Sequence, residues 1–390
     1  MRLDPKLILS IFFILSLLLI ALDLLVIVDS SDDVVDLYTK TKRKIPDTLP
    51  WYSIIVFGDN RPQDTSSNVF PSVFYTFIDE LKNINPIAVI GTGDHVGSGY
   101  ESQYQALYQV FNGSGLENIW LAMGNHDVEV NEGWNNWEKY VGPRYYYVDD
   151  IPGWRIGFGN TEFKTTIEFQ NHISSFYENL DNRSLILVLH RPVYPDVDHN
   201  IRSDWIPVLK SIFDEKGYPK LVLQGHWHGW AYEIRDNVTW IITGGAGAPL
   251  YTYGVEEPSK GEVVTGVYHY MVLILYPNQT FTFYPVRIGF GSLNVEQINS
   301  TTYMVVNNKL DVHNKPVSMP VRIKYQYEDI EIDFVGMIPG KSIVYVNFRI
   351  EEDILSIRAN TSNWYIYIYN ESNPDQSTVY IPKNNKVTIE

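Results

Sequence analysis

The sequence predicts an α/β domain that follows a membrane-spanning helix and precedes a small all-β domain. Between Trp51 and Phe290, short apolar runs alternate with helix-like segments, which is the pattern of a sheet flanked by helices. From Gly291 onward, stretches of alternating polar and apolar residues replace the helical signal. Near the start, Leu7–Val28 is almost wholly apolar. We therefore divide the chain into a membrane anchor (1–28), a stalk (29–50), an α/β domain (51–290) and a β-sandwich-like domain (291–390).

The composition limits the classes of partner. The 390 residues carry a net charge of −16, which argues against a nucleic acid polymer, because binding to a phosphate backbone needs clustered lysine and arginine. A small phosphorylated substrate is compatible with this charge, since bound metal ions reverse the local field. The chain has no cysteine, which excludes disulfides, thiolate metal sites and cysteine nucleophiles. The oligomeric state is left open.

The apolar run Leu7–Val28 predicts a membrane anchor. It is 22 residues long, and a helix needs about 20 residues to cross a bilayer. Only Ser10, Ser16 and Asp23 interrupt it, and no small-residue cleavage site follows. We interpret it as a signal anchor. The alternatives are a cleaved signal peptide, which would make the protein secreted, and a buried hydrophobic helix.

The orientation of this anchor is set by two opposing charge signals and by sequons. Arg2 and Lys6 favour a cytoplasmic N-terminus, but the basic residues between Lys40 and Lys44 compete with them. Asn-X-Ser/Thr sequons favour a glycosylated body outside the cell membrane. These sequons begin at Asn112, Asn182, Asn237, Asn278, Asn299, Asn360 and Asn370.

The strands and helices are predicted from apolar runs and their periodicity. Five buried strands are expected at Ser53–Phe57, Ile87–Ile90, Ile119–Met123, Leu185–Leu189 and Leu221–Leu223. Helices are expected between them at Ser72–Asn83, Ser102–Phe111, Ile167–Leu180 and Arg202–Glu215. Further strands are expected at Ala231–Ile234, Val238–Thr243, Val263–Tyr276 and Thr280–Ile288. The C-terminal domain is expected to contain strands at Val321–Tyr327, Ile330–Val335, Ser342–Ile350, Trp364–Tyr369 and Thr378–Ile381.

Each of the five buried strands leads to a side chain of a type that binds metals. Open α/β sheets bind ligands at the carboxyl ends of their strands, so each of these side chains is expected to lie at a ligand-binding crevice. Carboxylate, amide and neutral imidazole together suit divalent Mn, Fe, Zn, Co or Ni better than Ca. The candidate ligands are Asp59, Asp94, Asn125, His190, His226 and His228.

The order of these motifs resembles the calcineurin-like metallophosphoesterase family. The motifs are Gly-Asp, Gly-Asp, Gly-Asn-His-Asp, His and Gly-His-X-His, and the resemblance covers Trp51 to Phe290. It implies a four-layer α-β-β-α sandwich with two divalent metal ions, and hydrolysis of a phosphate ester by a metal-bound hydroxide. The substrate stays open among phosphomonoesters, nucleotides, phosphodiesters and diphosphates. The rival interpretation is a catalytically impaired surface protein that keeps the fold for a binding or structural role.

The resemblance also implies a role for each site residue. It assigns one metal to Asp94, Asn125, His190 and His226, and the other to Asp59, Asp94 and His228. Because His226 and His228 are two residues apart on a segment expected to be extended, their side chains should share a face. His126 is expected to face the phosphate, as a general acid for the leaving oxygen or as a transition-state donor. Asp127 either orients His126 or caps the backbone after the turn.

Arg61 departs from the family pattern, which has a metal-binding histidine two residues after the first aspartate. Arginine is always protonated and cannot be a ligand. The first metal therefore binds weakly, or water or another side chain fills the gap. Arg61 itself is expected either to clamp the phosphate or to form a surface salt bridge. His95 is a candidate replacement ligand, and the alternative is a packing or second-layer histidine.

The remaining aromatic and glycine-rich features receive weaker roles. Gly244–Pro249 either completes the rim of the site or is a simple inter-strand loop. Aromatic residues near the motifs could stack on a leaving group, although packing is their expected role: Tyr194, Trp227 and Trp230. The other histidines are expected to be structural or solvent-exposed: His172, His199, His269 and His313.

Overall fold

The structure is a computed structural model that describes residues 34–351, 354–370 and 377–389. The expected membrane helix Leu7–Val28 lies outside these residues and stays a prediction. Within the described ranges, no helix combines the length and the apolar character needed to cross a membrane.

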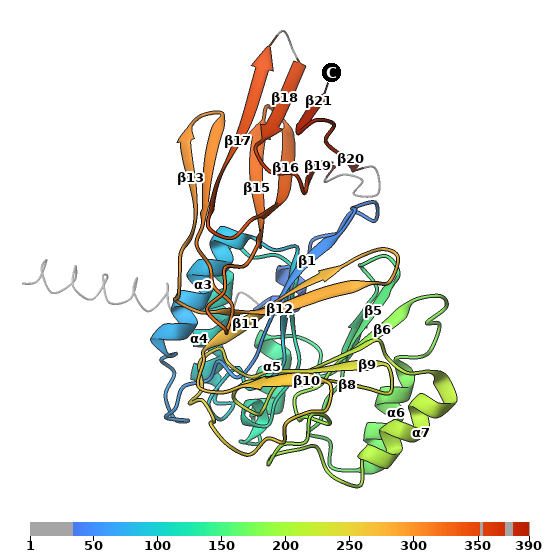
Figure 1. The fold of residues 1–390 in the computed structure, drawn as a ribbon. Helices are drawn as coiled ribbons and strands as arrows, with labels where there is room; N and C mark the ends of the chain where they lie inside the picture. Colours follow the sequence, from blue (N-terminus) through green and yellow to red (C-terminus); the bar gives the residue numbers. More distant parts are fainter. Residues whose placement is uncertain (1–33, 352–353, 371–376, 390) are drawn as a thin grey trace, which may run out of the picture.

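Two β-sheets face each other at the centre of the α/β domain (Figure 1). The first contains, in spatial order, β12 (Phe281–Arg287), β11 (His269–Leu275), β1 (Tyr52–Phe57), β2 (Ala88–Gly91) and β3 (Ile119–Leu121). The second contains β10 (Gly261–Val264), β8 (Trp230–Arg235), β9 (Val238–Thr243), β7 (Leu221–Gln224), β6 (Ser184–Val188), β5 (Trp154–Phe158) and β4 (Tyr146–Val148). β1 to β3 are parallel, as are β9, β7, β6 and β5.

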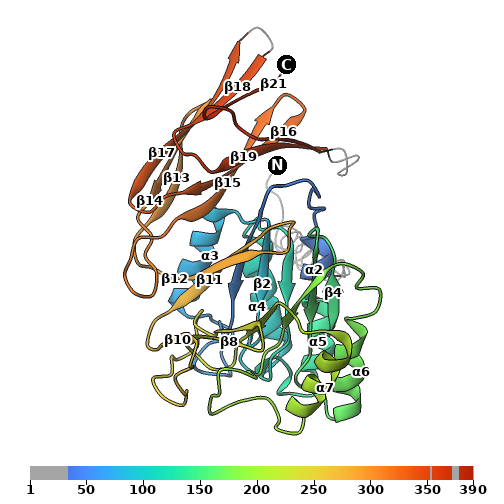
Figure 2. The same cartoon turned by 45° about the vertical axis from the view of Figure 1, so that its right-hand side comes forward.

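Helices cover the outer faces of both sheets (Figure 2). In β6, Leu185 and Leu187 pack with the helices on the outside, whereas Ile186 and Val188 join the core between the sheets. On the first sheet, Phe57 of β1 packs against aromatic rings of two helices. The expected α/β sandwich is therefore confirmed. Its helices are α3 (Ser72–Ile84), α4 (Glu101–Asn112), α5 (Gly133–Tyr140), α6 (Thr166–Ser175) and α7 (Ile206–Lys216).

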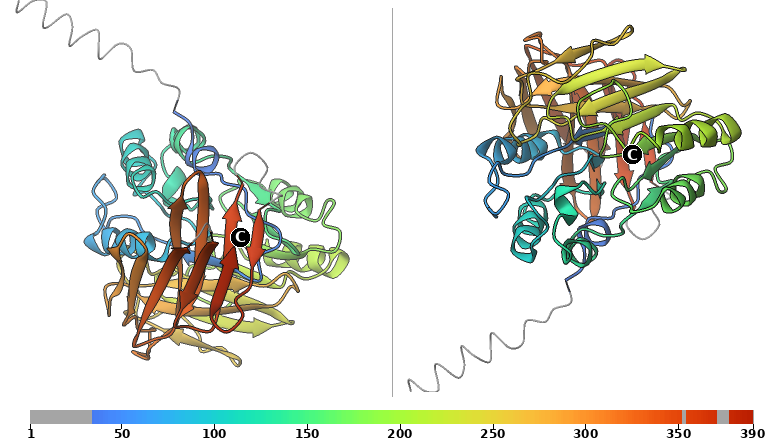
Figure 3. Two further views of the ribbon diagram at one scale, coloured as in Figure 1. Left: turned by 90° about the horizontal axis from the view of Figure 1, so that it is seen from above. Right: turned by 90° about the horizontal axis from the view of Figure 1, so that it is seen from below.

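A β-sandwich follows the α/β domain and lies over it in the view from above (Figure 3). One sheet contains β13 (Leu293–Asn299), β14 (Thr302–Asn307), β17 (Ser342–Glu351), β18 (Ile354–Ala359) and β21 (Lys386–Ile389). The other contains β15 (Met319–Tyr327), β16 (Ile330–Ile338), β19 (Trp364–Tyr369) and β20 (Thr378–Tyr380). Tyr325 and Phe348 stack across the two sheets, with ring centroids 4.1 Å apart. Along β17, Val344 and Val346 are buried, whereas Tyr345 between them is exposed.

A partly buried ionic cluster joins the two domains. Glu117, which follows α4, forms ion pairs with Arg43 and Arg322 (2.7 Å each) and with Lys324. Arg322 and Lys324 belong to β15, so the cluster connects the α/β domain to the sandwich. Burial raises the pKa of Glu117, but the three cations outweigh burial and lower it to about 2.

The segment expected to be a stalk packs against the body from residue 34 onward. It contains the short helix α2 (Leu37–Lys40), and Leu37, Ile45 and Leu49 are buried. Arg43 of the same segment contributes to the ionic cluster. The apolar residues in this otherwise polar stretch explain why it does not stand free.

Several strands were not expected from the sequence, among them β4, β5, β13 and β14, and two further differences have a local explanation. The expected single strand Val263–Tyr276 is two strands, β10 and β11, which pair in different sheets. The loop between them contains Gly266 at a φ of 68°, a left-handed conformation that ends a strand. Helix α5 was not expected, because its sequence begins with glycine and contains two asparagines, which are weak helix formers.

We predict that Glu117→Gln lowers the free energy of unfolding by roughly 1–3 kcal/mol at neutral pH, because it removes one charged hydrogen-bond acceptor from a cluster in which Glu331 and Asp333 still face the cations. The pKa of Glu117 is lowered in the folded state, so its contribution is complete above pH ~4.3 and is lost as the pH falls toward 2. Denaturant titrations between pH 7 and pH 2 measure this. The matched control is Asp79→Asn, which removes an exposed ion pair with Lys82. A variant that keeps the wild-type acid dependence would contradict the assignment.

Candidate metal centre

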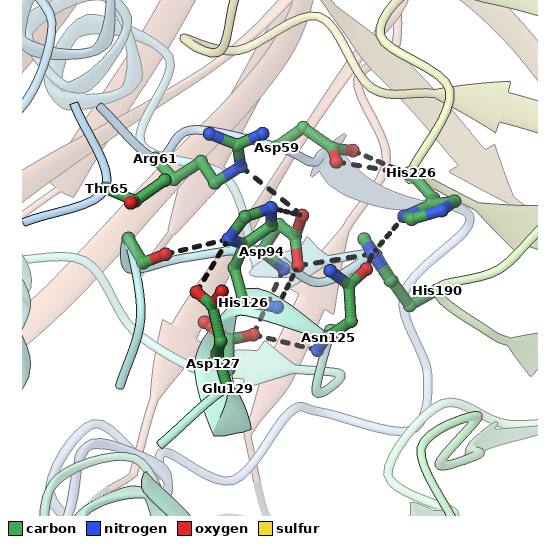
Figure 4. A network of polar contacts seen from close by, with 12 residues as sticks. Asp59, Arg61, Thr65, Asp94, Asn125, His126, Asp127, Glu129, His190 and His226 are labelled. Atoms are coloured by element: carbon green, nitrogen blue, oxygen red, sulfur yellow. Dashed lines mark hydrogen bonds and ion pairs between the residues drawn. The ribbon is translucent and has the colours of Figure 1, made fainter. Parts of the chain in front are cut away.

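Loops from both sheets bring the candidate ligands to one site (Figure 4). The first sheet supplies residues after β1, β2 and β3, and the second supplies residues after β6 and β7. The residues from the first sheet are Asp59, Asp94, Asn125 and His126, and those from the second are His190, His226 and His228. The carboxyl ends of parallel strands therefore converge as expected.

The first donor group contains four side chains, with His190 at its centre. The Nε2 atom of His190 lies 3.2 Å from Asp94 Oδ1, 3.1 Å from Asn125 Oδ1 and 3.0 Å from His226 Nδ1. Asp94, His190 and His226 each offer a donor atom within 4.8 Å of the others, and all three are buried or nearly so. We call this set, with Asn125, the four-donor position.

The second donor group contains Asp59, Asp94 and His228, whose donor atoms also lie within 4.8 Å of one another. His228 Nε2 is 3.4 Å from Asp59 Oδ1, and His228 Nδ1 is 2.7 Å from the carbonyl oxygen of Pro249. A proton on Nδ1 satisfies that carbonyl and leaves the lone pair of Nε2 facing the carboxylates. We call this set the three-donor position.

The residues fit a pair of divalent ions. Asp94 belongs to both positions, its side chain is 1% exposed, and its Oδ2 atom has no hydrogen-bond partner among the described residues. A buried carboxylate oxygen without a donor is costly unless a cation compensates it. The donor set of carboxylate, amide and imidazole matches the ligands that transition metals prefer.

Three of these ligands have a strained backbone. Asp59, Asp94 and His226 have φ values of 57°, 55° and 65°, a left-handed conformation that residues other than glycine rarely adopt. Hydrogen bonds hold these loops: the His226 N–H donates to both carboxylate oxygens of Asp59, at 3.1 and 2.9 Å. The segment from His226 to His228 is consequently bent rather than extended, and the expectation of an extended segment is wrong. His226 and His228 nevertheless lie in different donor groups.

Glycines next to the ligands allow the loops to approach closely. A Cβ atom at Gly124 would lie 2.3 Å from the Asp94 backbone nitrogen, and one at Gly225 would lie 2.6 Å from Asp59 Oδ2. No side chain fits at either place, so the glycines of the motifs are required by contact between loops.

Asp127 supports the site through the backbone. Its carboxylate accepts hydrogen bonds from the N–H groups of Asp94 (3.0 Å), His95 (2.8 Å), Val96 (3.0 Å) and Gly124 (2.8 Å). No hydrogen bond links it to the His126 ring among the described residues. The geometry thus supports the backbone cap over the orientation of His126, and it makes Asp127 the residue that positions Asp94.

His126 lies beside the donor groups rather than within them. Its Nδ1 atom is 2.8 Å from the carbonyl oxygen of Gly97, and its Nε2 atom is 4.0 Å from Asp94 Oδ2. The carbonyl favours a proton on Nδ1, so Nε2 is the atom directed at the site. The side chain is 20% exposed, which leaves it within reach of a ligand.

Arg61 and His95 have different surroundings. Arg61 Nε lies 3.5 Å from Asp94 Oδ2, and the side chain is only 11% exposed, so it is not a surface ion pair. His95 is fully buried, and its Nδ1 atom lies 2.8 Å from Asn60 Oδ1. Burial lowers its pKa to about 3. Its ring packs near Phe57 and Trp137, which supports the packing alternative over a replacement ligand.

The electrostatics of the histidine pair reflect the Asp94 carboxylate. Burial lowers the pKa of His190, but Asp94 outweighs burial and raises it to about 9. Burial and the neighbouring His190 lower the pKa of His226 to about 2. The Asp94 carboxylate therefore stabilises positive charge on His190, and a bound cation would take the place of that proton.

Several residues near the site were not expected from the sequence. Arg191 Nη1 lies 3.1 Å from His226 Nε2, and its Nε is held by Glu162 Oε1 at 2.8 Å. Tyr251 stacks on His228 with centroids 4.4 Å apart, and the His199 ring lies 5.7 Å from His226. The position of Arg191 directly after His190 was a usable signal, whereas the loops that carry Tyr251 and His199 have no motif.

The remaining features have supporting roles. The backbone of Gly244–Pro249 contacts the Asp59 loop: Ala246 N donates to Gly58 O (3.0 Å) and Ala248 N donates to Asp59 O (2.7 Å). The loop therefore supports the site. Trp227 and Trp230 are fully buried, and Tyr194 packs on Trp240, so all three aromatic residues have packing roles. Of the other histidines, His172 and His269 are buried and His313 pairs with Glu262, whereas His199 lies beside the donor His226.

Comparisons with known proteins find one matching family model and several structures with a similar fold. Residues 52–230 match the sequence model of the family described as calcineurin-like phosphoesterase. Among solved structures, GAP50, described as the anchor in the inner membrane complex of Plasmodium, has a TM-score of 0.51 and is 16% identical, covering 62% of this chain and 86% of that one. At that identity the likeness concerns the fold alone.

Two phosphatase structures give lower scores. Purple acid phosphatase PPD1 from yellow lupin seeds has a TM-score of 0.48 and 15% identity, covering 69% of this chain and 53% of that one. A dimetal phosphatase from Danio rerio has a TM-score of 0.42 and 8% identity, covering 66% of this chain and 96% of that one. No curated protein matches the chain.

We predict that Asn125→Ala and His226→Ala each lose the ion of the four-donor position, because each removes a donor that no neighbour replaces. Metal content after dialysis, measured by mass spectrometry, reports this directly. His313→Ala is the matched control, since His313 pairs with Glu262 outside the donor groups, and it should keep its metal. Full metal content in both site variants would contradict the donor assignment.

Proposed function

We propose that this chain, which belongs to the calcineurin-like phosphoesterase family through residues 52–230, catalyses metal-dependent hydrolysis of a phosphate ester. The observation that carries the proposal is the convergence of two donor groups on one shared carboxylate, Asp94. The substrate is proposed to be small, because the net charge of −16 argues against a nucleic acid polymer as the partner.

The residues of the site divide the chemistry between them. Two divalent ions held by the four-donor and three-donor positions would neutralise the phosphate oxygens and lower the pKa of a water molecule. In its imidazolium form His126 would donate the Nε2 proton to the leaving oxygen and become a neutral imidazole, while its Nδ1–H stays bonded to the Gly97 carbonyl. Arg61 supplies guanidinium donors to a phosphate oxygen, since its Nε atom has no hydrogen-bond partner among the described residues.

Hydrolysis of a generic aryl phosphate tests this function. Activity should require Mn²⁺ or another transition metal and should disappear after chelation. A fully metal-loaded protein that hydrolyses no phosphomonoester, phosphodiester or diphosphate would contradict it.

The rival function is a binding or structural role on a retained fold. Arg61 beside Asp94 favours it, because it replaces a family ligand. GAP50, which shares the fold, is described as an anchor. Retention of every other ligand favours hydrolysis, and metal content measured together with aryl phosphate turnover separates the two.

We propose further that the body faces the outside of the cell membrane, held by Leu7–Val28. The sequons support this, because six of the seven asparagines are exposed and only Asn370 is half-buried. Protease added to intact cells should cleave the protein. A protected body on a membrane-bound protein would reverse the orientation.

We predict that His126→Ala keeps its metal but loses activity, and that the loss is largest for esters whose leaving group needs a proton. General acid catalysis is worth about 10²–10⁴-fold, so alkyl phosphates should lose this factor while activated aryl phosphates lose far less. The measurement is kcat for a series of esters that differ in leaving-group pKa. An equal loss for all esters would show that His126 is not the acid.

A further inference from the structure

The two metal positions are unequal in both donors and charge. The four-donor position combines Asp94 with Asn125, His190 and His226, whereas the three-donor position has only Asp59, Asp94 and His228. No histidine replaces the family ligand at Arg61, because His95 is buried against aromatic rings.

Arg61 places a permanent positive charge beside the shared carboxylate. Its Nε atom lies 3.5 Å from Asp94 Oδ2, while Asp94 Oδ1 faces His190 at 3.2 Å. Neither Arg61 Nε nor Asp94 Oδ2 has a hydrogen-bond partner among the described residues, and both atoms are buried. The guanidinium cannot lose its proton, so it remains positive when a metal ion binds.

This charge opposes full metal loading. Two divalent ions carry more positive charge than Asp59 and Asp94 neutralise, and Arg61 adds to that excess. Because Arg61 faces the carboxylate that both positions share, its charge would repel an ion bound to that carboxylate, and such repulsion is stronger in a buried site than in water. An anion between the guanidinium and the ions would attract both and turn the net repulsion into attraction. A phosphate group is the anion that the proposed function supplies.

We propose that the four-donor position binds a divalent ion unaided, and that the three-donor position fills only when a phosphate group lies against Arg61. The inference rests on the proposed function and names how that site is regulated. In the absence of substrate the chain holds one ion, and the phosphate group of the substrate completes the second position.

Equilibrium dialysis against Mn²⁺, at fixed free ion and with or without inorganic phosphate, tests this through the metal content of the protein. Wild type should hold one ion without phosphate and two with it, with the second ion binding at least about tenfold more tightly when phosphate is present. Arg61→Ala and Arg61→His should hold two ions without phosphate. Arg61→Lys should keep the phosphate dependence, because it keeps the charge.

The matched control is Arg144→Ala, which removes an arginine paired with Glu138 away from the donor groups and should behave as wild type. Wild type that holds two ions equally well without phosphate, or Arg61→Ala that gains no second ion, would overturn the inference. If such a protein still hydrolyses a phosphate ester, the proposed function stands and only this inference fails. If neither position binds Mn²⁺, both fail.

Discussion

Asp94 is the side chain on which the two halves of the site depend. Its carboxylate is almost fully buried, it contributes to both donor groups, and one of its oxygens has no hydrogen-bond partner among the described residues. Its backbone is held in a left-handed conformation. Asp127 stabilises that conformation by accepting the N–H groups of three successive residues, Asp94 to Val96, together with that of Gly124.

The fold explains why ligands from distant parts of the sequence reach Asp94. Two parallel strand runs, one in each sheet, end at the same edge of the sandwich. The first sheet delivers carboxylates and an amide, and the second delivers imidazoles. Close loop contact through Gly124 and Gly225 then sets the separation of the donors. The C-terminal sandwich contacts α3 and the Glu117 cluster instead, so it stabilises the domain without supplying a ligand among the described residues.

The sequence was sufficient for the elements that depend on local patterns. Apolar runs ending in motif residues located β1, β2, β3, β6 and β7, and the motif order indicated the family. Interactions between distant residues were not predictable in this way. The Glu117 cluster combines segments separated by more than a hundred residues, and the contact between Arg61 and Asp94 depends on two loops from different strands. The bend at His226 depends on a hydrogen bond to Asp59, which local propensity does not contain.

Anomalous diffraction from crystals grown with Mn²⁺ and inorganic phosphate tests the central claim most directly, because it locates each ion relative to Asp94. The account predicts two peaks about 3.5–4 Å apart, one next to Asn125, His190 and His226 and the other next to Asp59 and His228, with Asp94 in contact with both. A single peak that Asp94 does not contact, or ions bound away from these residues, would contradict it.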